Sequence, residues 1–470
     1  MKQKAKFILV GLAGLLAGAA LTVNLSAIAD KDAATALPVA ELRAFTDVFA
    51  RIKSDYVEPV DDKKLITEAI TGMLTGLDPH SAYLDVEGFK DLQVGTQGEF
   101  GGLGIEVGME DGFVKVVSPI EDTPAFKAGV KPGDLIIRLD DTPVKGMTLN
   151  DAVKRMRGKP GTSIKLTIAR KDVAQPIVLT LTRAVIKIRS VKSTLVDPGY
   201  GYVRVTQFQE HTGELLAEAL NTLYKDNKAP LKGLILDMRN DPGGLLNGAV
   251  AVTAAFVKPD SLVVYTEGRS EDAKMRLTAS REHYLHPMQA DYLKNLPEGV
   301  KSVPMVVLVN MGSASASEIV AGALQDHKRA IVMGTRTFGK GSVQTILPIG
   351  NGTAIKLTTA RYYTPNGRSI QAKGIEPDIV VEDPAMPESE NGFGLREADL
   401  AKHLVNPAGD EPAPTVKPDD TTKAPADKQG KNGEDKKPVA LEPGEIVSKN
   451  DFQMNQALNL LKGLQIMQGR

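Results

Sequence analysis

One segment decides the fold of this chain: Val309-Asn310-Met311-Gly312-Ser313-Ala314-Ser315-Ala316-Ser317-Glu318-Ile319. It ends an apolar run that begins at Met305 and opens a helical pattern that continues to Asp326. A serine at such a strand-to-helix joint has an exposed hydroxyl with backbone N–H groups nearby, which suits a nucleophile whose attack creates an oxyanion. The serines could instead only cap the helix, because a cap needs a single oxygen acceptor.

The same alternation of strand and helix extends from about Gly199 to Asp383. An apolar run at Gly233–Asp237 precedes a helical stretch at Leu245–Val257, just as Met305–Asn310 precedes Ala316–Asp326. This order predicts an α/β core with strand-to-helix turns.

Length and composition limit the classes of protein that fit. A chain of 470 residues is too long for one ordinary core, so we expect two or three domains. The 57 basic and 58 acidic residues nearly cancel, which gives no electrostatic reason to expect a nucleic-acid partner. The lack of cysteine excludes disulfides, thiolate metal sites and a cysteine nucleophile.

The N-terminus has the pattern of an export signal. Lys2, Lys4 and Lys6 precede an apolar run at Phe7–Val23, and Ala27-Ile28-Ala29 then offers a signal-peptidase site. We therefore predict a signal peptide or membrane anchor over residues 1–29, and a place in the periplasm or cell envelope of a bacterium. A retained anchor and a cleaved leader both fit the pattern, and a buried helix is the remaining alternative.

Helical and unstructured patterns flank the rest of the chain. Residues 38–95 carry apolar stripes at helical spacing, typical of core or dimer contacts. Residues 386–446 are poor in large apolar residues and predict a flexible linker, disordered over Pro407–Lys437. Residues 447–470 predict a C-terminal helix with a lone apolar stripe of Met454, Leu458, Leu461 and Leu464. Such a stripe needs a partner, so we expect a homo-oligomer.

A separate small module spans residues 96–172. Glycines in Phe100-Gly101-Gly102-Leu103-Gly104-Ile105-Glu106-Val107 stand before a strand, where N–H groups could hold a carboxylate while a peptide adds to the strand edge. Pro124–Asp134 and a helix-like Leu149–Arg157 follow, and the combination resembles PDZ domains of bacterial proteases. The peptide-binding residues would be Gly101, Gly102, Leu103, Gly104 and Ile105, with a pocket for apolar residues beside Leu103 and Ile105. The glycines could also serve only tight turns.

A lysine is the candidate general base. None of the six histidines lies in a recognisable protease context, and no Gly-x-Ser-x-Gly elbow occurs. Burial can lower a lysine pKa from about 10.4 toward ~7 to 8, which makes it a base at neutral pH. Lys340, in Thr337-Phe338-Gly339-Lys340-Gly341-Ser342-Val343-Gln344, is flanked by glycines that permit close packing. By itself such a lysine could equally be a solvated loop residue.

These segments together resemble the C-terminal processing and tail-specific peptidases of family S41. The third segment of the resemblance is Asp237-Met238-Arg239-Asn240-Asp241-Pro242-Gly243-Gly244. Further matches are Asp78–Leu84, Arg361–Gly367 and Gly374–Asp378, with His80 as a departure to which we attach no catalytic meaning.

The resemblance implies roles for individual residues. Ser315 would be the nucleophile, Lys340 the base 25 residues later, and Gln344 the group that orients the ammonium. Gly243 or Gly244, with Ala316, would supply the N–H groups of the oxyanion hole. We read Asp237, Arg239, Glu318 and Asp326 as structural supports.

The resemblance also implies the architecture and the activity. We expect an α/β multidomain protein with a ClpP/crotonase-like protease core (residues 173–385), an inserted PDZ domain, a helical N-terminal region and a C-terminal helix after a disordered linker. It would be an exported serine endopeptidase that cleaves proteins near their C-termini, without metal or cofactor. Its partners would be protein or peptide substrates with accessible C-termini, and an adaptor protein is a further candidate partner. The alternative is a catalytically silent PDZ scaffold, against which Ser315, Lys340 and Gln344 argue jointly.

Overall fold

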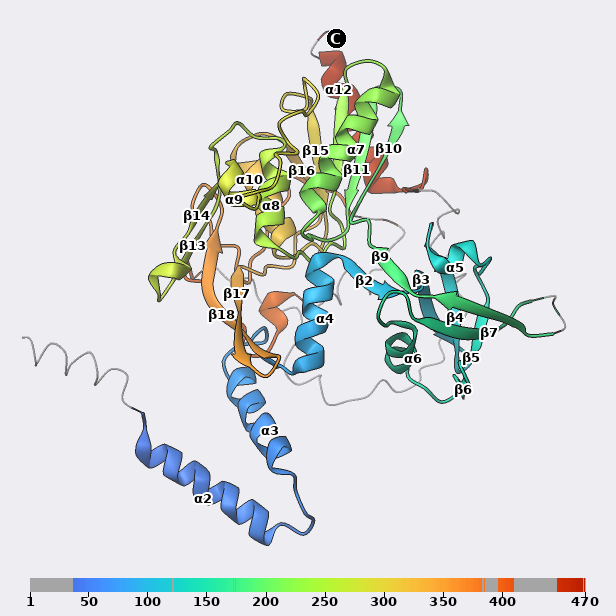
Figure 1. Ribbon diagram of the computed structural model, residues 1–470. Coiled ribbons are helices and arrows are strands. Elements are labelled where there is room, and N and C mark those ends of the chain that lie inside the picture. Colours follow the sequence, from blue (N-terminus) through green and yellow to red (C-terminus); the bar gives the residue numbers. More distant parts are fainter. Residues whose placement is uncertain are drawn as a thin grey trace, which may run out of the picture. The chain divides into compact units, whose positions relative to one another are not determined.

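The structure is a computed structural model that describes residues 37–120, 122–171, 173, 175–382, 384, 396–409, 446–467 and 469 (Figure 1). The chain divides into two compact units, Met1–Met73 and Leu74–Arg470. The predicted leader at residues 1–29 lies outside the described residues. Within the described ranges, no helix is long and apolar enough to cross a membrane.

The first unit contains helix α2 (Val39–Asp55) and most of α3 (Asp62–Thr75). Both helices lie where the apolar spacing predicts helices. Lys53 Nζ lies 2.8 Å from Asp62 Oδ1 and links the two. No residue of α2 is fully buried, and its Leu42, Phe45 and Val48 are exposed, whereas Phe49 and Ile52 are half-buried.

The α/β core of the second unit is built on a six-stranded sheet. Its order is β10 (Val191–Asp197), β11 (Tyr200–Val205), β12 (Gly233–Asp237), β15 (Met305–Val309), β16 (Ile331–Gly334) and β19 (Ile379–Val380). Only β10 is antiparallel, and the others run parallel. Every residue of β12 and β15 is buried, as expected for parallel strands covered on both faces.

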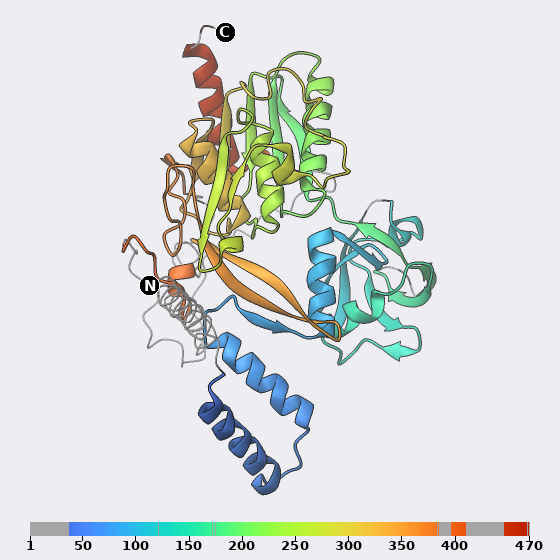
Figure 2. The same ribbon diagram turned by 60° about the vertical axis from the view of Figure 1, so that its left-hand side comes forward.

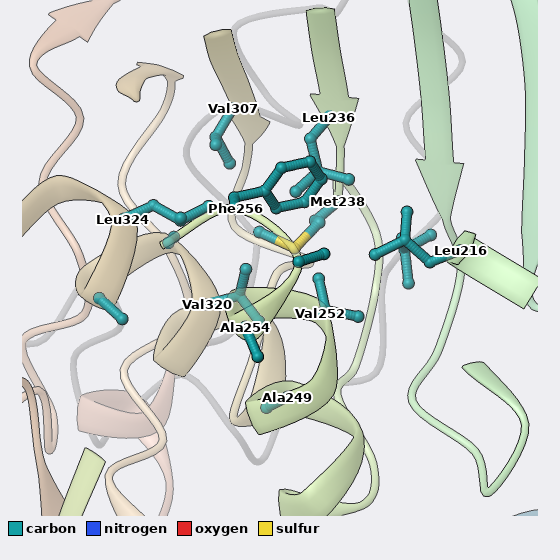
Figure 3. Packing of buried hydrophobic residues seen from close by; sticks show 14 of the residues in the cluster. Leu216, Leu236, Met238, Ala249, Val252, Ala254, Phe256, Val307, Val320 and Leu324 are labelled. Carbon is teal, nitrogen blue, oxygen red and sulfur yellow. The ribbon is translucent and has the colours of Figure 1, made fainter. Parts of the chain in front are cut away.

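Three helices cover one face of this sheet. They are α7 (Thr212–Asn227), α8 (Leu246–Ala254) and α10 (Ala316–Asp326). Figure 3 shows Leu236 and Val307 of the sheet among side chains of these helices. The predicted α/β core is therefore confirmed, with its strand-to-helix turns at one edge of the sheet.

Helix α12 (Phe452–Met467) covers the opposite face. Its buried Met454, Leu458 and Leu461 form one cluster with alternate strand residues such as Ile235 and Leu308. The apolar stripe of the C-terminal helix thus has a partner in its own chain, where the sequence suggested assembly with another chain.

A second sheet carries the segment after Lys340. Its order is β1 (Ala82–Leu84), β18 (Thr353–Tyr363), β13 (Leu262–Gly268) and β14 (Arg276–Thr278), and β17 (Ser342–Gly350) also pairs with β18. Figure 2 shows the long β17–β18 hairpin with β1 along it. Because Ala82 pairs with Lys356, the Asp78–Ser81 turn is brought to this hairpin.

The small module that resembles a PDZ domain contains a sheet of order β3 (Ile105–Glu110), β4 (Phe113–Pro119), β5 (Leu135–Leu139), β7 (Ser163–Ala169) and β8 (Ile177–Thr182), with β6 (Thr142–Pro143) on β5. Helices α5 (Pro124–Lys127) and α6 (Leu149–Met156) accompany it. The predicted boundary at residue 172 divides this sheet, because β8 pairs with β7 from Ile177 onward. A separate pair joins β2 (Glu99–Gly102) to β9 (Ala184–Lys187), and α4 (Val86–Gln97) precedes it.

Residues 396–409, which we call the strap, lie within the predicted linker but pack on the core. The strap begins with the short helix η2 (Glu397–Asp399), and its Glu397, Ala398 and Asn406 are buried. The Glu397 N–H donates to Phe338 O at 3.1 Å. The prediction of a flexible linker is therefore wrong for the strap. That prediction rested on the small number of large apolar residues, and composition does not reveal polar residues that are held by specific hydrogen bonds.

Candidate active site

Ser315 occupies the joint between β15 and α10, as the N-cap residue of the helix. Its φ of 55° and ψ of −111° form a conformation that a residue with a side chain adopts only under strain. The two flanking serines have structural partners: Ser313 Oγ donates to Met238 O and Ser317 Oγ to Asp241 O, each at 2.8 Å. The three serines therefore differ in role, and the flanking pair ties the joint to the end of β12.

Glu318 binds the segments of both candidate catalytic residues. Its fully buried Oε2 accepts the N–H of Ser315 at 2.8 Å and the N–H of Lys340 at 3.0 Å. Its Oε1 accepts the Thr337 hydroxyl at 2.5 Å and the Gly339 N–H at 2.8 Å. Burial raises the pKa of Glu318 to about 7, against these hydrogen bonds. The two oxygens accept four hydrogen bonds, which fits the ionised carboxylate because that form only accepts hydrogen bonds.

Tyr362 joins the same two segments through their carbonyl groups. Its buried hydroxyl lies 3.1 Å from Ser315 O and also contacts Lys340 O. Burial raises the pKa of Tyr362 well above its usual value, so the hydroxyl keeps its proton and remains a donor. Ser315 and Lys340 are thus brought together at backbone level by one carboxylate and one phenol.

Lys340 has the environment of a lysine base. Burial first, and then the positive charge of Lys356, lower its pKa, while Glu397, Glu318 and Asp78 oppose this change. Among the described residues its ammonium forms no ion pair, and no hydrogen bond joins it to the Ser315 hydroxyl.

Gln344 lies on β17 with its amide directed elsewhere. Its Nε2 donates to Ser342 Oγ at 3.0 Å and to Thr358 Oγ1 at 3.2 Å. Within the part of the chain that the structure describes, no hydrogen bond links it to Lys340. The reason is the strand register, because Gln344 pairs directly with Thr358 across the hairpin. The expected role of Gln344 in orienting the ammonium is therefore not seen in this arrangement.

The two candidate oxyanion glycines differ in the use of their N–H groups. Gly243 (φ 96°) donates its N–H to Asp241 Oδ1 at 2.9 Å. In the described ranges, neither the Gly244 N–H nor the Ala316 N–H has a hydrogen-bond partner. A Cβ on Gly243 would lie 2.8 Å from Ala316 N, so only glycine permits this approach of the loop to the joint. The free donors favour Gly244 and Ala316 as the oxyanion pair.

The five predicted peptide-binding residues divide into two groups. Gly101 and Gly102 belong to β2 and pair with β9, and Leu103 is buried in the core of the module. Leu103 therefore does not line an open pocket. Gly104 (φ 75°) leads into Ile105, the first residue of β3, which is the edge strand of its sheet. Only these last two positions lie where a peptide could add as a further strand.

Sequence reasoning missed three residues around Ser315 and Lys340. Tyr362 lies in a segment that matched the family and gave no hint of its contacts, and Glu397 lies in the predicted linker. Asp241 is fully buried, its Oδ2 lacks a hydrogen-bond partner, and burial raises its pKa to about 7. In the described ranges, no three His, Cys, Asp or Glu side chains are grouped to hold a metal ion.

Comparisons with known proteins match three parts of the chain. The family model "Peptidase family S41" matches residues 199–381, "PDZ domain" matches residues 101–181, and "Activating protease CtpB N-terminal domain" matches residues 8–88. The S41 match covers β11 to β19, which includes Ser315, Lys340 and the glycine loop.

Relatives match over nearly the full length. The carboxy-terminal-processing protease of Bartonella bacilliformis is 45% identical over 430 residues, which are 90% of this chain and 88% of the relative. The carboxy-terminal processing protease CtpA of Bacillus subtilis is 36% identical, over 82% of this chain and 78% of the relative. A solved photosystem II D1 C-terminal processing protease is 31% identical, with a TM-score of 0.41 over 79% of this chain and 92% of that one. The chain belongs to peptidase family S41, among the carboxy-terminal-processing serine proteases that carry a PDZ domain.

Proposed function

We propose that Ser315 and Lys340 form the catalytic dyad of this protease. The proposal rests on two contacts that hold both residues together. Glu318 Oε2 accepts the N–H groups of both residues, and the Tyr362 hydroxyl lies between their carbonyl groups. The lowered pKa of Lys340 supports the neutral amine that a general base requires.

The chemistry follows from this arrangement. Ser315 Oγ attacks the scissile carbonyl carbon while Lys340 Nζ takes the hydroxyl proton. The N–H groups of Gly244 and Ala316 bind the oxyanion that forms. The tetrahedral intermediate expels the amine, which takes the proton from Lys340, and an acyl ester on Ser315 remains. Water then gives a proton to Lys340 and attacks the acyl carbon. The bond between that carbon and Ser315 Oγ breaks, the proton returns from Lys340 to Ser315 Oγ, and the carboxylic acid product leaves. The Ser315–Lys340 hydrogen bond is expected to form when substrate excludes water, as catalytic hydrogen bonds often do.

Two variants test the dyad. Ser315→Ala removes the nucleophile and Lys340→Met removes the base, so each should lower the hydrolysis rate of an unfolded protein at least about a thousandfold. Ser302→Ala and Lys225→Met change exposed residues of the same types and should leave the rate unchanged. Hydrolysis that persists in either dyad variant, in a preparation free of other proteases, contradicts the proposal.

The PDZ module is proposed to hold the C-terminal residues of the substrate. Within the described part of the chain no strand pairs with the outer edge of β3, and its Ile105 and Val107 contact the same core cluster as Leu149 and Val153 of α6. An added peptide strand would place its alternate side chains toward these apolar residues. A peptide with a free C-terminal carboxylate should bind the purified chain more tightly than its C-terminal amide.

Export, assembly and activation remain proposals of the same kind. The apolar run and the cleavage-like site in residues 1–29 support export to the periplasm or cell envelope. The exposed apolar stripe of α2 supports a homo-oligomer. An adaptor protein that presents substrates would raise the hydrolysis rate of the purified chain when it is added.

A further inference from the structure

A buried contact joins two distant parts of the sequence. Glu397 of the strap is fully buried, and its Oε2 lies 2.7 Å from Nε2 of His80, whose side chain is 16% exposed. Because a carboxylate only accepts, Nε2 must carry the proton of this hydrogen bond. Glu397 Oε1 accepts from Gln371 Nε2 at 2.9 Å. Each oxygen of the Glu397 carboxylate thus accepts one hydrogen bond, Oε2 from the His80 ring and Oε1 from the Gln371 amide.

Glu397 is also tied to the loop on both sides of Lys340. Its own N–H donates to Phe338 O at 3.1 Å, two residues before Lys340. On the other side, Gly341 donates its N–H to Gln371 Oε1 at 3.0 Å. Asn406, also in the strap, donates a hydrogen bond from its Nδ2 to the backbone carbonyl of Gln371 at 2.7 Å. The position of the Lys340 loop therefore depends on the strap.

The charges that face Lys340 come from four elements. Lys356 on β18 favours the neutral amine, and Glu397, Glu318 and Asp78 favour the ammonium, with Glu397 first among the three. Tyr362 also faces this site but stays neutral.

The three carboxylates differ in how their charge is distributed. Glu318 accepts four hydrogen bonds. Asp78 also accepts four, from His80 N–H, from the N–H and Oγ of Ser81 and from Thr358 Oγ1. Among the described residues, the side chain of Glu397 has only the donors His80 and Gln371, so less of its charge is compensated locally.

We propose that the His80–Glu397 pair is a positioning element of the proteolytic site, which holds the Lys340 loop and sets the pH range in which Lys340 can accept a proton. The proposal rests on the proposed Ser315–Lys340 dyad. It gives the strap a role in the reaction, although neither residue of the pair touches the reacting atoms.

The first test is the dependence of kcat/KM on pH. The rate should rise with pH as Lys340 loses its proton. Glu397→Gln removes a negative charge at nearly constant shape, so the ammonium form of Lys340 is less favoured. The rising limb, which is the part of the pH profile where kcat/KM increases, should therefore move to lower pH by on the order of one pH unit. Lys356→Gln removes a positive charge and should move the limb to higher pH. Opposite shifts from two neighbouring substitutions cannot result from a loosened structure alone.

His80 provides the matched pair of variants. His80→Ala leaves Glu397 Oε2 buried without a donor, which favours the protonated, neutral acid. Its limb should therefore move in the same direction as that of Glu397→Gln. His80→Gln retains a donor and should restore a limb close to that of the parent. Glu382→Gln removes an exposed carboxylate and should leave the limb in place.

A second readout follows the protonation of Lys340 without activity. Acetylation of Lys340 by acetic anhydride at a series of pH values, measured by mass spectrometry in the Ser315→Ala background, should show the same shifts. If Glu397→Gln leaves both the rate limb and the acetylation curve unchanged while the dyad variants are inactive, the role of the pair is overturned. If hydrolysis survives Ser315→Ala or Lys340→Met, the dyad itself fails and this proposal fails with it.

Discussion

Asp241 stands between the glycine loop and the serine joint, and its buried carboxyl group has an unusual balance of partners. Its Oδ1 accepts the Gly243 N–H, and its backbone carbonyl accepts from Ala314 N–H and Ser317 Oγ. Its Oδ2 has no hydrogen-bond partner among the described residues, so burial of the charged form is poorly compensated and the pKa rises to about 7. Arg204 provides the charge that opposes this rise.

Asp241→Asn should change the pH dependence of stability. Between about pH 4 and pH 7 the unfolded chain has lost a proton that the folded chain keeps, so the contribution of Asp241 to the free energy of unfolding falls as pH rises. The slope is at most about 1.4 kcal/mol for each pH unit and disappears above pH 7. Relative to the parent, the variant should therefore gain stability across this range, as measured by urea unfolding at several pH values. Asp226→Asn, an exposed change, is the control, and parallel curves for parent and Asp241→Asn would contradict the argument.

At the scale of elements, α12 covers a face of the six-stranded sheet that would otherwise be exposed. Leu461 is fully buried against β12, whereas Ile466 on the same helix is 80% exposed. Arg239, which follows β12, adds a polar link, because its Nη2 lies 2.6 Å from both Asp237 Oδ2 and Asp451 Oδ2. The helix therefore stabilises the strand that leads to the glycine loop.

Leu461→Ala should lower the free energy of unfolding by about 2 to 5 kcal/mol, because the lost side chain leaves a cavity between α12 and the sheet. Ile466→Ala removes a similar volume from an exposed position and should change it by less than about 0.5 kcal/mol. Chemical denaturation followed by far-UV circular dichroism measures both. Equal effects of the two substitutions would show that α12 is not docked on the sheet in solution.

Sequence patterns predicted elements better than they predicted the contacts between them. The apolar runs at Gly233–Asp237 and Met305–Val309 predicted buried strands because continuous apolar character is itself a consequence of burial on both faces. The stripe of α12 predicted a helix that needs a partner, but the same stripe fits a second chain or a sheet in its own chain. Gln344 was placed correctly on the segment after Lys340, yet its hydrogen bonds depend on the β17–β18 register, which no local pattern specifies.

At the scale of the molecule, the N-terminal unit exposes the clearest surface for assembly. Leu42, Phe45 and Val48 of α2 are each between 44% and 59% exposed. We propose that this surface holds a homo-oligomer together; Phe45→Glu places a charge in it, so the particle mass measured by light scattering should fall. Arg43→Ala changes an exposed polar position of the same helix and should leave the mass unchanged. A Phe45→Glu variant with the mass of the parent would contradict the proposal that α2 holds a homo-oligomer together.

The backbone at Ser315 links the reaction to the stability of the whole molecule. A φ of 55° costs a serine conformational energy that glycine would largely avoid, and Glu318 and Tyr362 hold the residue there. Selection for stability alone would favour glycine at this position, and the chain would then lose the nucleophile that we propose. The reactive hydroxyl is thus kept at the expense of a more relaxed fold, and any variant library screened only for thermal tolerance would be expected to enrich inactive proteins at this site.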